Sequence, residues 1–183
     1  MSSPSKRLML SAAAAIALGY LITMVVTGAL PENRQIAEFQ AEGLLEQAPE
    51  SITRVAVAVK DASHVFVRRG SDWITESGAG PVSTEIAAAL DRALKIMHNA
   101  KPVRVLTGDD LTGASPAEFG FDQPRVAVTL GNANGTVLAA QFGASNTDGI
   151  LQFMRVKGKD QVYLMSDFVG QGWEKLAMAA KAQ

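Results

Sequence analysis

The sequence predicts an α+β protein: a single N-terminal transmembrane helix, then an antiparallel-sheet domain of two meanders with one central amphipathic helix and a short C-terminal helix. Three observations predict it. Leu8–Leu30 carries no charge, residues 86–97 repeat apolar side chains at helical spacing, and the segments between Arg125 and Met165 alternate like strands. The expected parts are a cytoplasmic N-terminus (1–7), an anchor (8–30), a juxtamembrane helix and linker (31–50), and an extracytoplasmic domain (51–183).

The uncharged run Leu8–Leu30 has the length of a membrane anchor. At about 1.5 Å per residue such a helix reaches roughly 34 Å, enough for a hydrocarbon core of about 30 Å. A cleaved secretory signal is the alternative, but its apolar core is usually only about 7 to 15 residues long. Lys6 and Arg7 precede the run, so the N-terminus is expected in the cytoplasm. The protein is therefore expected in a bacterial inner (cytoplasmic) membrane, single-pass, with its C-terminal domain in the periplasm or outside.

Charge and cysteine content narrow the classes of partner. The chain has 17 Lys and Arg against 18 Asp and Glu, and Lys6 and Arg7 are the only charges before Pro31. A surface that binds polyphosphate chains is markedly basic, so nucleic acid is not expected as a partner. The absence of Cys rules out disulfides, thiolate nucleophiles and thiolate metal ligands.

The segment after the anchor predicts a helix over Pro31–Gln47 whose apolar residues follow one face. This stripe either covers its own domain or faces a neighbouring membrane subunit. Small residues in the anchor let a second helix approach closely, with plain lipid contact as the alternative. The candidate partner-docking residues are therefore Gly19, Gly28, Ile36, Phe39 and Leu44.

Period-2 patterns predict the strands of the domain. Apolar alternation predicts three short strands around Ile52–Val59, Val65–Arg69 and Trp73–Ile74, joined by polar turns. A strand is also expected at Val103–Leu106. The clearest pattern follows, with four antiparallel strands expected in sequence order and separated by Gly with Asn or Asp, at Arg125–Leu130, Thr136–Phe142, Ile150–Val156 and Gln161–Met165.

Helical spacing predicts two helices in the domain. Ser83 is a suitable N-cap for a helix to about Asn99, with an apolar stripe of Ile86, Leu90, Ala93, Leu94 and Met97. A short C-terminal helix is expected to use Trp173, Leu176, Ala177 and Ala180. Gly170 and Gly172 are expected to weaken its start.

Two groups of residues are of the types that catalysis uses. His64 stands beside Asp61 and Ser63, the residue types of a triad, but neighbours on one turn do not point at one another and no nucleophile elbow supports them. Asp109 and Asp110 form a carboxylate pair, yet adjacent acids on an extended chain point apart. No catalytic residue and no enzyme activity are predicted.

Two further motifs were tested for ligand binding. Asn146, Asp148 and Gly149 resemble part of a calcium loop, but the first and twelfth positions of that loop hold no carboxylate, which favours a hairpin turn. Gly78 and Gly80 before the Ser83 helix form a weak anion-binding signal, because the other residues of a phosphate loop are missing. No metal and no cofactor are predicted.

The segment Glu118-Phe119-Gly120-Phe121-Asp122-Gln123-Pro124 before a Val-rich strand, with the Val65–Arg69 strand leading to Trp73, resembles a bacterial domain-of-unknown-function family. The resemblance covers one copy, about residues 51–165. It implies a membrane-anchored extracytoplasmic domain of the kind found, often in tandem, in auxiliary proteins of ABC-type transporters, and it brings no activity. The residue types of the motif also favour a structural role. The two Phe side chains are expected to enter the core from a tight turn, Asp122 to accept hydrogen bonds from amides, and Pro124 to begin a strand. The structural-motif residues are Phe119, Gly120, Phe121, Asp122, Pro124 and Trp73.

The function expected from these patterns is that of a non-catalytic membrane accessory subunit. Its anchor and outer domain are expected to dock onto a larger complex, with integral membrane subunits and the lipid bilayer as partners. The alternative is an extracytoplasmic ligand- or polymer-binding auxiliary of an ABC-type transporter, which requires a concave pocket with convergent polar groups. A hydrolase, the third class, predicts that His64→Ala or Asp110→Ala abolishes an activity.

Overall fold

The computed structural model describes residues 4–26, 42–60, 62–77 and 80–181, and the chain divides into two units, Met1–Gln40 and Ala41–Gln183. Helix α1, Pro4–Val26, belongs to the first unit. Within the described residues, no helix combines the length and apolar character needed to cross a membrane. Gly28 and the rest of the expected anchor after Val26 lie outside the described residues.

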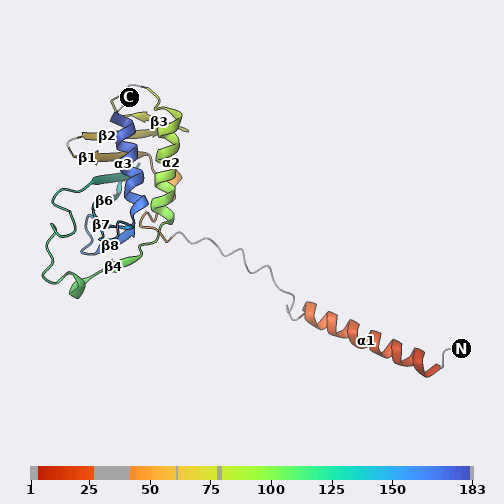
Figure 1. The fold of residues 1–183 in the computed structure, drawn as a ribbon. Helices are drawn as coiled ribbons and strands as arrows, with labels where there is room; N and C mark the ends of the chain where they lie inside the picture. The colour runs from red at the N-terminus through yellow and green to blue at the C-terminus, as the bar shows by residue number, and fades with distance from the viewer. Residues whose placement is uncertain (1–3, 27–41, 61, 78–79, 182–183) are drawn as a thin grey trace. The chain divides into compact units, whose positions relative to one another are not determined.

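The second unit contains one antiparallel sheet of eight strands in the order β3-β2-β1-β5-β6-β7-β8-β4, with helices against one face (Figure 1). Its strands are β1 (Arg54–Val59), β2 (Ala62–Arg69), β3 (Asp72–Thr75), β4 (Arg104–Leu106), β5 (Val126–Asn132), β6 (Gly135–Ser145), β7 (Leu151–Val156) and β8 (Val162–Ser166). The α+β class is confirmed. Pairing of β1 with β5 joins the two meanders into a single sheet, and β4 lies beside β8 at the far edge.

Alternation along each strand separates the two faces of this sheet. On β1, Val55 and Val57 are fully buried, whereas Ala56 between them and Ala58 after Val57 are only half-buried. Val57 pairs with Val128 of β5, and their side chains point to the same face because side chains alternate along paired strands. The core therefore lies on the helix-covered face.

Helix α2, Thr84–Asn99, matches the helix predicted after Ser83. The Ser83 hydroxyl accepts a hydrogen bond from Ile86 N at 3.3 Å, which caps the first turn. The predicted apolar stripe from Ile86 to Met97 is buried in the core. Local pattern was sufficient here because one face of the helix carries nearly all the buried side chains.

Helix α3, Asp167–Lys181, is longer than the short C-terminal helix expected from the sequence. It begins directly after β8 and runs through Gly170 and Gly172. A side chain at Gly170 would collide with Gln152, so this glycine lets the helix lie close to the sheet. The packing gained by this close approach outweighs the helix propensity that the glycines lack.

The two helices lie side by side across the strands (Figure 1). Helix α3 contacts strands from β8 to β2, and α2 packs on α3. The largest buried side chains under them include Trp73, Trp173, Phe66 and Phe142. Strand β4, outside β8, lies beyond the strands that α3 contacts.

The start of the second unit is not helical, in contrast to the helix expected up to Gln47. Gly43 N donates to His98 O at 2.9 Å and Leu45 N donates to Met97 O at 3.2 Å, so this segment pairs with the end of α2. A side chain at Gly43 would collide with the backbone of Met97 and His98. The hydrogen bonds of this segment to the end of α2 therefore form instead of the helix that the local pattern predicts.

Candidate docking surface

A group of polar side chains gathers where α3 leaves the sheet, and we call it the polar cluster: Arg125, Ser145, Gln152, Asp167, Gln171 and Glu174. Gln152 is 0% exposed and Asp167 is 7% exposed, although both are polar. Buried polar groups are stable only when they are hydrogen-bonded, so the cluster depends on its internal contacts.

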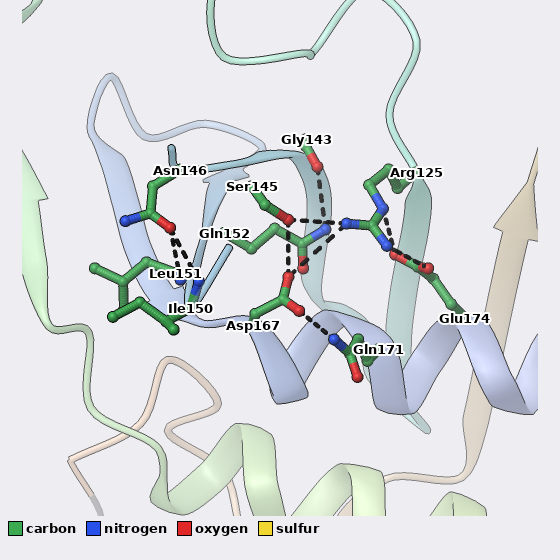
Figure 2. Close-up of polar contacts among 10 residues, drawn as sticks. All are labelled: Arg125, Gly143, Ser145, Asn146, Ile150, Leu151, Gln152, Asp167, Gln171 and Glu174. Carbon is green, nitrogen blue, oxygen red and sulfur yellow. Dashed lines mark hydrogen bonds and ion pairs between the residues drawn. The ribbon is translucent and has the colours of Figure 1, made fainter. Parts of the chain in front are cut away.

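Asp167, the first residue of α3, is the centre of the polar cluster (Figure 2). Ser145 Oγ donates to Asp167 Oδ1 at 3.0 Å, and Gln171 donates to Asp167 Oδ2. Arg125 Nη1 donates to Ser145 Oγ at 2.9 Å, and Arg125 Nη2 donates to Glu174 Oε2 at 3.0 Å. A carboxylate in the first turn also complements the helix dipole. These contacts fix the first two turns of α3 to the ends of β5 and β6.

Gln152 supports the same junction from β7. Its Nε2 donates to Gly143 O at 3.0 Å, where the pairing of β6 with β7 shifts register between Phe142 and Ser145. Its Oε1 is buried without a hydrogen-bond partner and lies against Gly170 of α3. Gln152 thus fills the space between the irregular end of β6 and the helix.

Asn146 organises the loop between β6 and β7 (Figure 2). Its Oδ1 accepts from Ile150 N at 3.1 Å and from Leu151 N at 3.0 Å, while Asp167 N donates to Ile150 O at 3.0 Å. The loop is therefore fixed at both ends, yet the Ile150 side chain is 66% exposed. A rigid backbone holds an apolar side chain in solvent.

Three more exposed apolar side chains lie near Ile150, around the start of α3 and the β4 edge. Phe168 follows Asp167 and is 56% exposed. Val105 of β4 pairs with Tyr163 of β8, so it points to the helix-covered face, but it remains exposed because β4 lies beyond α3. The apolar corner is defined as Val103, Val105, Ile150 and Phe168.

The topology places these four residues at one corner although they are distant in sequence. Val103 N donates to Leu164 O at 2.8 Å, next to the end of β8 from which α3 starts. Within the described residues, no strand pairs with the outer edge of β4, whereas Val82 N donates to Trp73 O at 2.9 Å and covers the edge of β3. The edge of β4 therefore lies open beside the exposed Val103 and Val105.

The polar cluster suits positioning better than catalysis. Ser145 already donates to a carboxylate and accepts from a guanidinium, and neither His64 nor His98 contacts it. Both contacts hold the Ser145 hydroxyl between Arg125 and Asp167. The cluster holds the start of α3, and Asp167 N also bonds to Ile150 O of the apolar corner.

Of the five predicted docking residues, Gly19 belongs to the first unit and Leu44 to the second. Gly19 lies in α1, and a Cβ added to it would have no neighbouring atom within 4 Å. Gly28, Ile36 and Phe39 lie outside the described residues. Leu44 is half-buried and packs against the core. Leu44 is held there because the adjoining Gly43 and Leu45 pair with the end of α2.

Phe119, Gly120 and Phe121 of the predicted structural motif lie on the face of the sheet opposite the helices. The ring of Phe119 is 5.0 Å from that of Phe153 and 5.9 Å from that of Phe121, which is buried. Gly120 has φ +73°, and a Cβ there would lie 2.5 Å from Ala144 N. The motif therefore covers the end of β6 and β7 on the face opposite the helices, rather than entering the main core.

The remaining motif residues differ in their contacts. Asp122 is exposed and, among the described residues, accepts no amide hydrogen bond, contrary to expectation; Pro124 precedes β5. Trp73 is buried, and its Nε1 donates to Asp91 Oδ1 at 3.0 Å. Arg68 lies over the Trp73 ring at 4.4 Å and donates to the same carboxylate at 2.5 Å. Together these contacts hold β2 and β3 against α2.

The other residues considered for chemistry are those of the His64 turn and the Asp109–Asp110 pair. Asp61 lies outside the described residues, so the His64 turn is only partly seen. Asp110 pairs with Arg104 at 2.7 Å and, with Thr107, forms the capping box of a 3-10 helix over Gly108–Leu111. Within the described residues, no group of His, Cys, Asp and Glu is arranged to hold a metal ion.

Sequence reasoning missed the polar cluster, although weak signals were present. Gln152 is a polar residue at an inward position of β7, whose other inward residues, Met154 and Val156, are apolar. Asp167, Gln171 and Glu174 follow the i, i+4, i+7 spacing of one helix face. These signals suggest a buried polar face, but they do not identify Arg125 and Ser145 as its partners.

Comparison with known families finds one match. A model of a domain of unknown function, DUF4340, matches residues 86–178, just over half of the chain. No curated protein and no solved structure matches the chain.

Proposed function

The chain belongs to the DUF4340 family, and from its apolar corner we propose that it is a non-catalytic accessory protein whose second unit docks onto another protein. The observation that carries the proposal is the exposure of four apolar side chains that strand register and backbone hydrogen bonds place around the start of α3 and the β4 edge: Val103, Val105, Ile150 and Phe168. Contiguous exposed apolar groups typically mark interaction sites, and aromatic residues are enriched among those that contribute most to binding.

The polar cluster adds to this argument because it limits the motion of the corner. The backbone of Ile150 is bonded to Asn146 and Asp167, and Phe168 follows the anchored Asp167. A preorganised surface loses less conformational entropy on binding than a mobile one. Burying the polar cluster costs desolvation free energy. Such a cost is expected where the cluster keeps the apolar side chains of Ile150 and Phe168 in place.

Site-specific photo-crosslinking in native cells tests the proposal. A crosslinking phenylalanine derivative is placed in the full chain at position 150, 168 or 178. Met178 is the matched control because it is 64% exposed but lies near the other end of α3. We expect one discrete crosslinked protein from positions 150 and 168 and none from 178. Equal crosslinking at all three positions, or none at 150 and 168, would contradict the proposal.

We propose that this docking takes place at a bacterial inner membrane, with the second unit outside the cytoplasm and an integral membrane protein as the partner. The support is the uncharged run Leu8–Leu30 and the preceding Lys6 and Arg7. The test is carbonate extraction of cell membranes, followed by protease treatment of spheroplasts. We expect the chain to stay in the membrane fraction and its C-terminal epitope tag to be digested from outside. A carbonate-soluble chain or a protected tag would overturn this location.

A ligand-binding auxiliary of an ABC-type transporter is the second candidate function. One observation favours it: a cavity of about 690 Å³ at the end of β1 and the start of β5, lined by Lys60, Asp122, Arg125 and Glu174 among others. Both signs of charge converge there, as a small zwitterionic ligand would require. Equilibrium dialysis against amino acids tests it, because binding that Lys60→Ala and Asp122→Asn each abolish would favour this candidate.

A further inference from the structure

The face of the sheet opposite the helices is apolar where it is expected to be polar. One row across it runs Val65, Ala56, Thr129 and Ala139, and these residues are neighbours through the register of β2, β1, β5 and β6. All four are half-buried, and no described helix lies on this face. Antiparallel sheets with one solvated face usually carry polar side chains there. This row instead carries mostly small side chains with one hydroxyl, that of Thr129.

A groove of about 480 Å³ lies on this face at β5, β6 and the end of β7. Its floor includes Ala127 and Ala139, and its rim includes Arg155, Lys157 and Lys159. No Asp or Glu lines it. The groove is thus locally basic although the whole chain has a net charge of −1.

The cations of the groove differ in how firmly they are held. Arg155 Nε donates to Gln141 Oε1 at 2.6 Å, and the guanidinium lies 4.8 Å from the centre of the Phe121 ring. Lys157 and Lys159 are exposed, and neither forms an ion pair within the described part of the chain. One cation is therefore preoriented, and two are available to a partner.

We propose that this groove binds an acidic amphipathic segment of a partner protein. Its apolar side would cover the alanine floor, and its carboxylates would meet Lys157 and Lys159. Small residues let a backbone approach closely, which increases dispersion contact. A purely apolar segment would desolvate the lysines without pairing them, and a polyanion without apolar groups would leave the floor uncovered. Both features of the groove are satisfied only by a segment that is acidic and apolar.

The groove lies on the face opposite the apolar corner, so this inference does not rest on the proposed function. Substitution of Phe168 is expected to leave binding at the groove unchanged. Failure of the groove experiment likewise says nothing against the crosslinks expected at positions 150 and 168.

Fluorescence anisotropy with labelled synthetic peptides tests the inference on the purified full chain. Three peptides of about 15 residues, long enough to form a helix on binding, are compared. The first has a Leu stripe with Glu elsewhere, the second the same stripe with Lys, and the third the Glu positions with Ser in place of Leu. We expect the first to bind roughly tenfold more tightly than the other two, and less tightly as salt is raised.

Charge-reversal variants locate the binding. Lys157→Glu combined with Lys159→Glu should weaken the acidic amphipathic peptide roughly tenfold. Lys175→Glu is the matched control, an exposed lysine on α3 on the other side of the sheet, and should leave the affinity unchanged. Equal binding of the Glu and Lys peptides, or equal loss in the control variant, overturns the inference. Equal binding of the Ser peptide overturns it in favour of a simple polyanion.

Discussion

Gly43 shows how one residue fixes the start of the second unit against the end of α2. Its N–H bonds to His98 O, and no side chain fits between it and the end of α2. The lack of a Cβ, rather than backbone freedom, is what this position requires.

The first prediction compares two glycines. Gly43→Ala forces a Cβ into the backbone of α2 and should lower the free energy of unfolding by about 1 to 3 kcal/mol. Gly172→Ala lies within α3 with no atom near the added Cβ, and should raise it by about 0.5 to 1 kcal/mol. Urea unfolding of both variants measures the difference. If Gly43→Ala were neutral, the described contact with α2 would be wrong.

Gly120 allows a second comparison, now within the Phe-Gly-Phe motif. Gly120 and Gly113 both have positive φ, but only Gly120 approaches another backbone, at Ala144 N. Alanine at either position should cost about 1 to 3 kcal/mol for the left-handed backbone, with an added packing cost at position 120 alone. Thermal unfolding compares the two, and an equal loss would show that backbone conformation alone explains the glycine.

At the scale of elements, the start of α3 depends on the polar cluster. Asp167→Ala removes the acceptor of Ser145 and Gln171 and leaves Arg125 with one fewer anion nearby. We expect a loss of about 1 to 3 kcal/mol, since partly buried donors lose their partner. Glu42→Ala removes an exposed ion pair with Lys101 and should cost below about 1 kcal/mol.

Urea unfolding measures both variants, and hydrogen exchange shows where the structure loosens. The amides of residues 167–174 should lose protection in Asp167→Ala and keep it in Glu42→Ala. Unchanged protection in Asp167→Ala would mean that packing of Trp173 and Leu176 alone fixes the helix.

At the scale of the whole molecule, the second unit has one continuous core. Trp73 from the β3 end and Trp173 from α3 belong to the same buried cluster. A single core of this size normally unfolds in one cooperative step.

The corresponding prediction concerns both tryptophans in one sample. With fluorinated tryptophan incorporated, the two ¹⁹F resonances should lose native intensity at the same urea concentration. Trp73→Phe assigns the resonances. Separate midpoints would show that the β1–β3 meander and the β5–β8 meander unfold independently, despite the pairing of β1 with β5.

The candidate surface was less predictable than the elements that carry it. Exposure of Phe168 could not be read from its sequence, because an aromatic residue near the start of an amphipathic helix is normally buried. The sequence around Val105 predicts an edge strand but not the exposure of this valine. That exposure follows from the register, which places Val105 opposite Tyr163 and beyond α3. Whether an apolar side chain is exposed depends on which segments pack over it, and these segments are distant in the sequence.

The sequence by itself determined the class, the strands and helix α2, because alternation and helical spacing record which side of each element is buried. It also predicted the order of β5 to β8, since short Gly-containing turns join neighbours. Tertiary structure alone decided that β1 pairs with β5, that α3 begins at Asp167, and that Arg125 meets Ser145 and Asp167. These contacts join segments 20 or more residues apart, and their free energy comes from packing and hydrogen bonds that no local pattern contains.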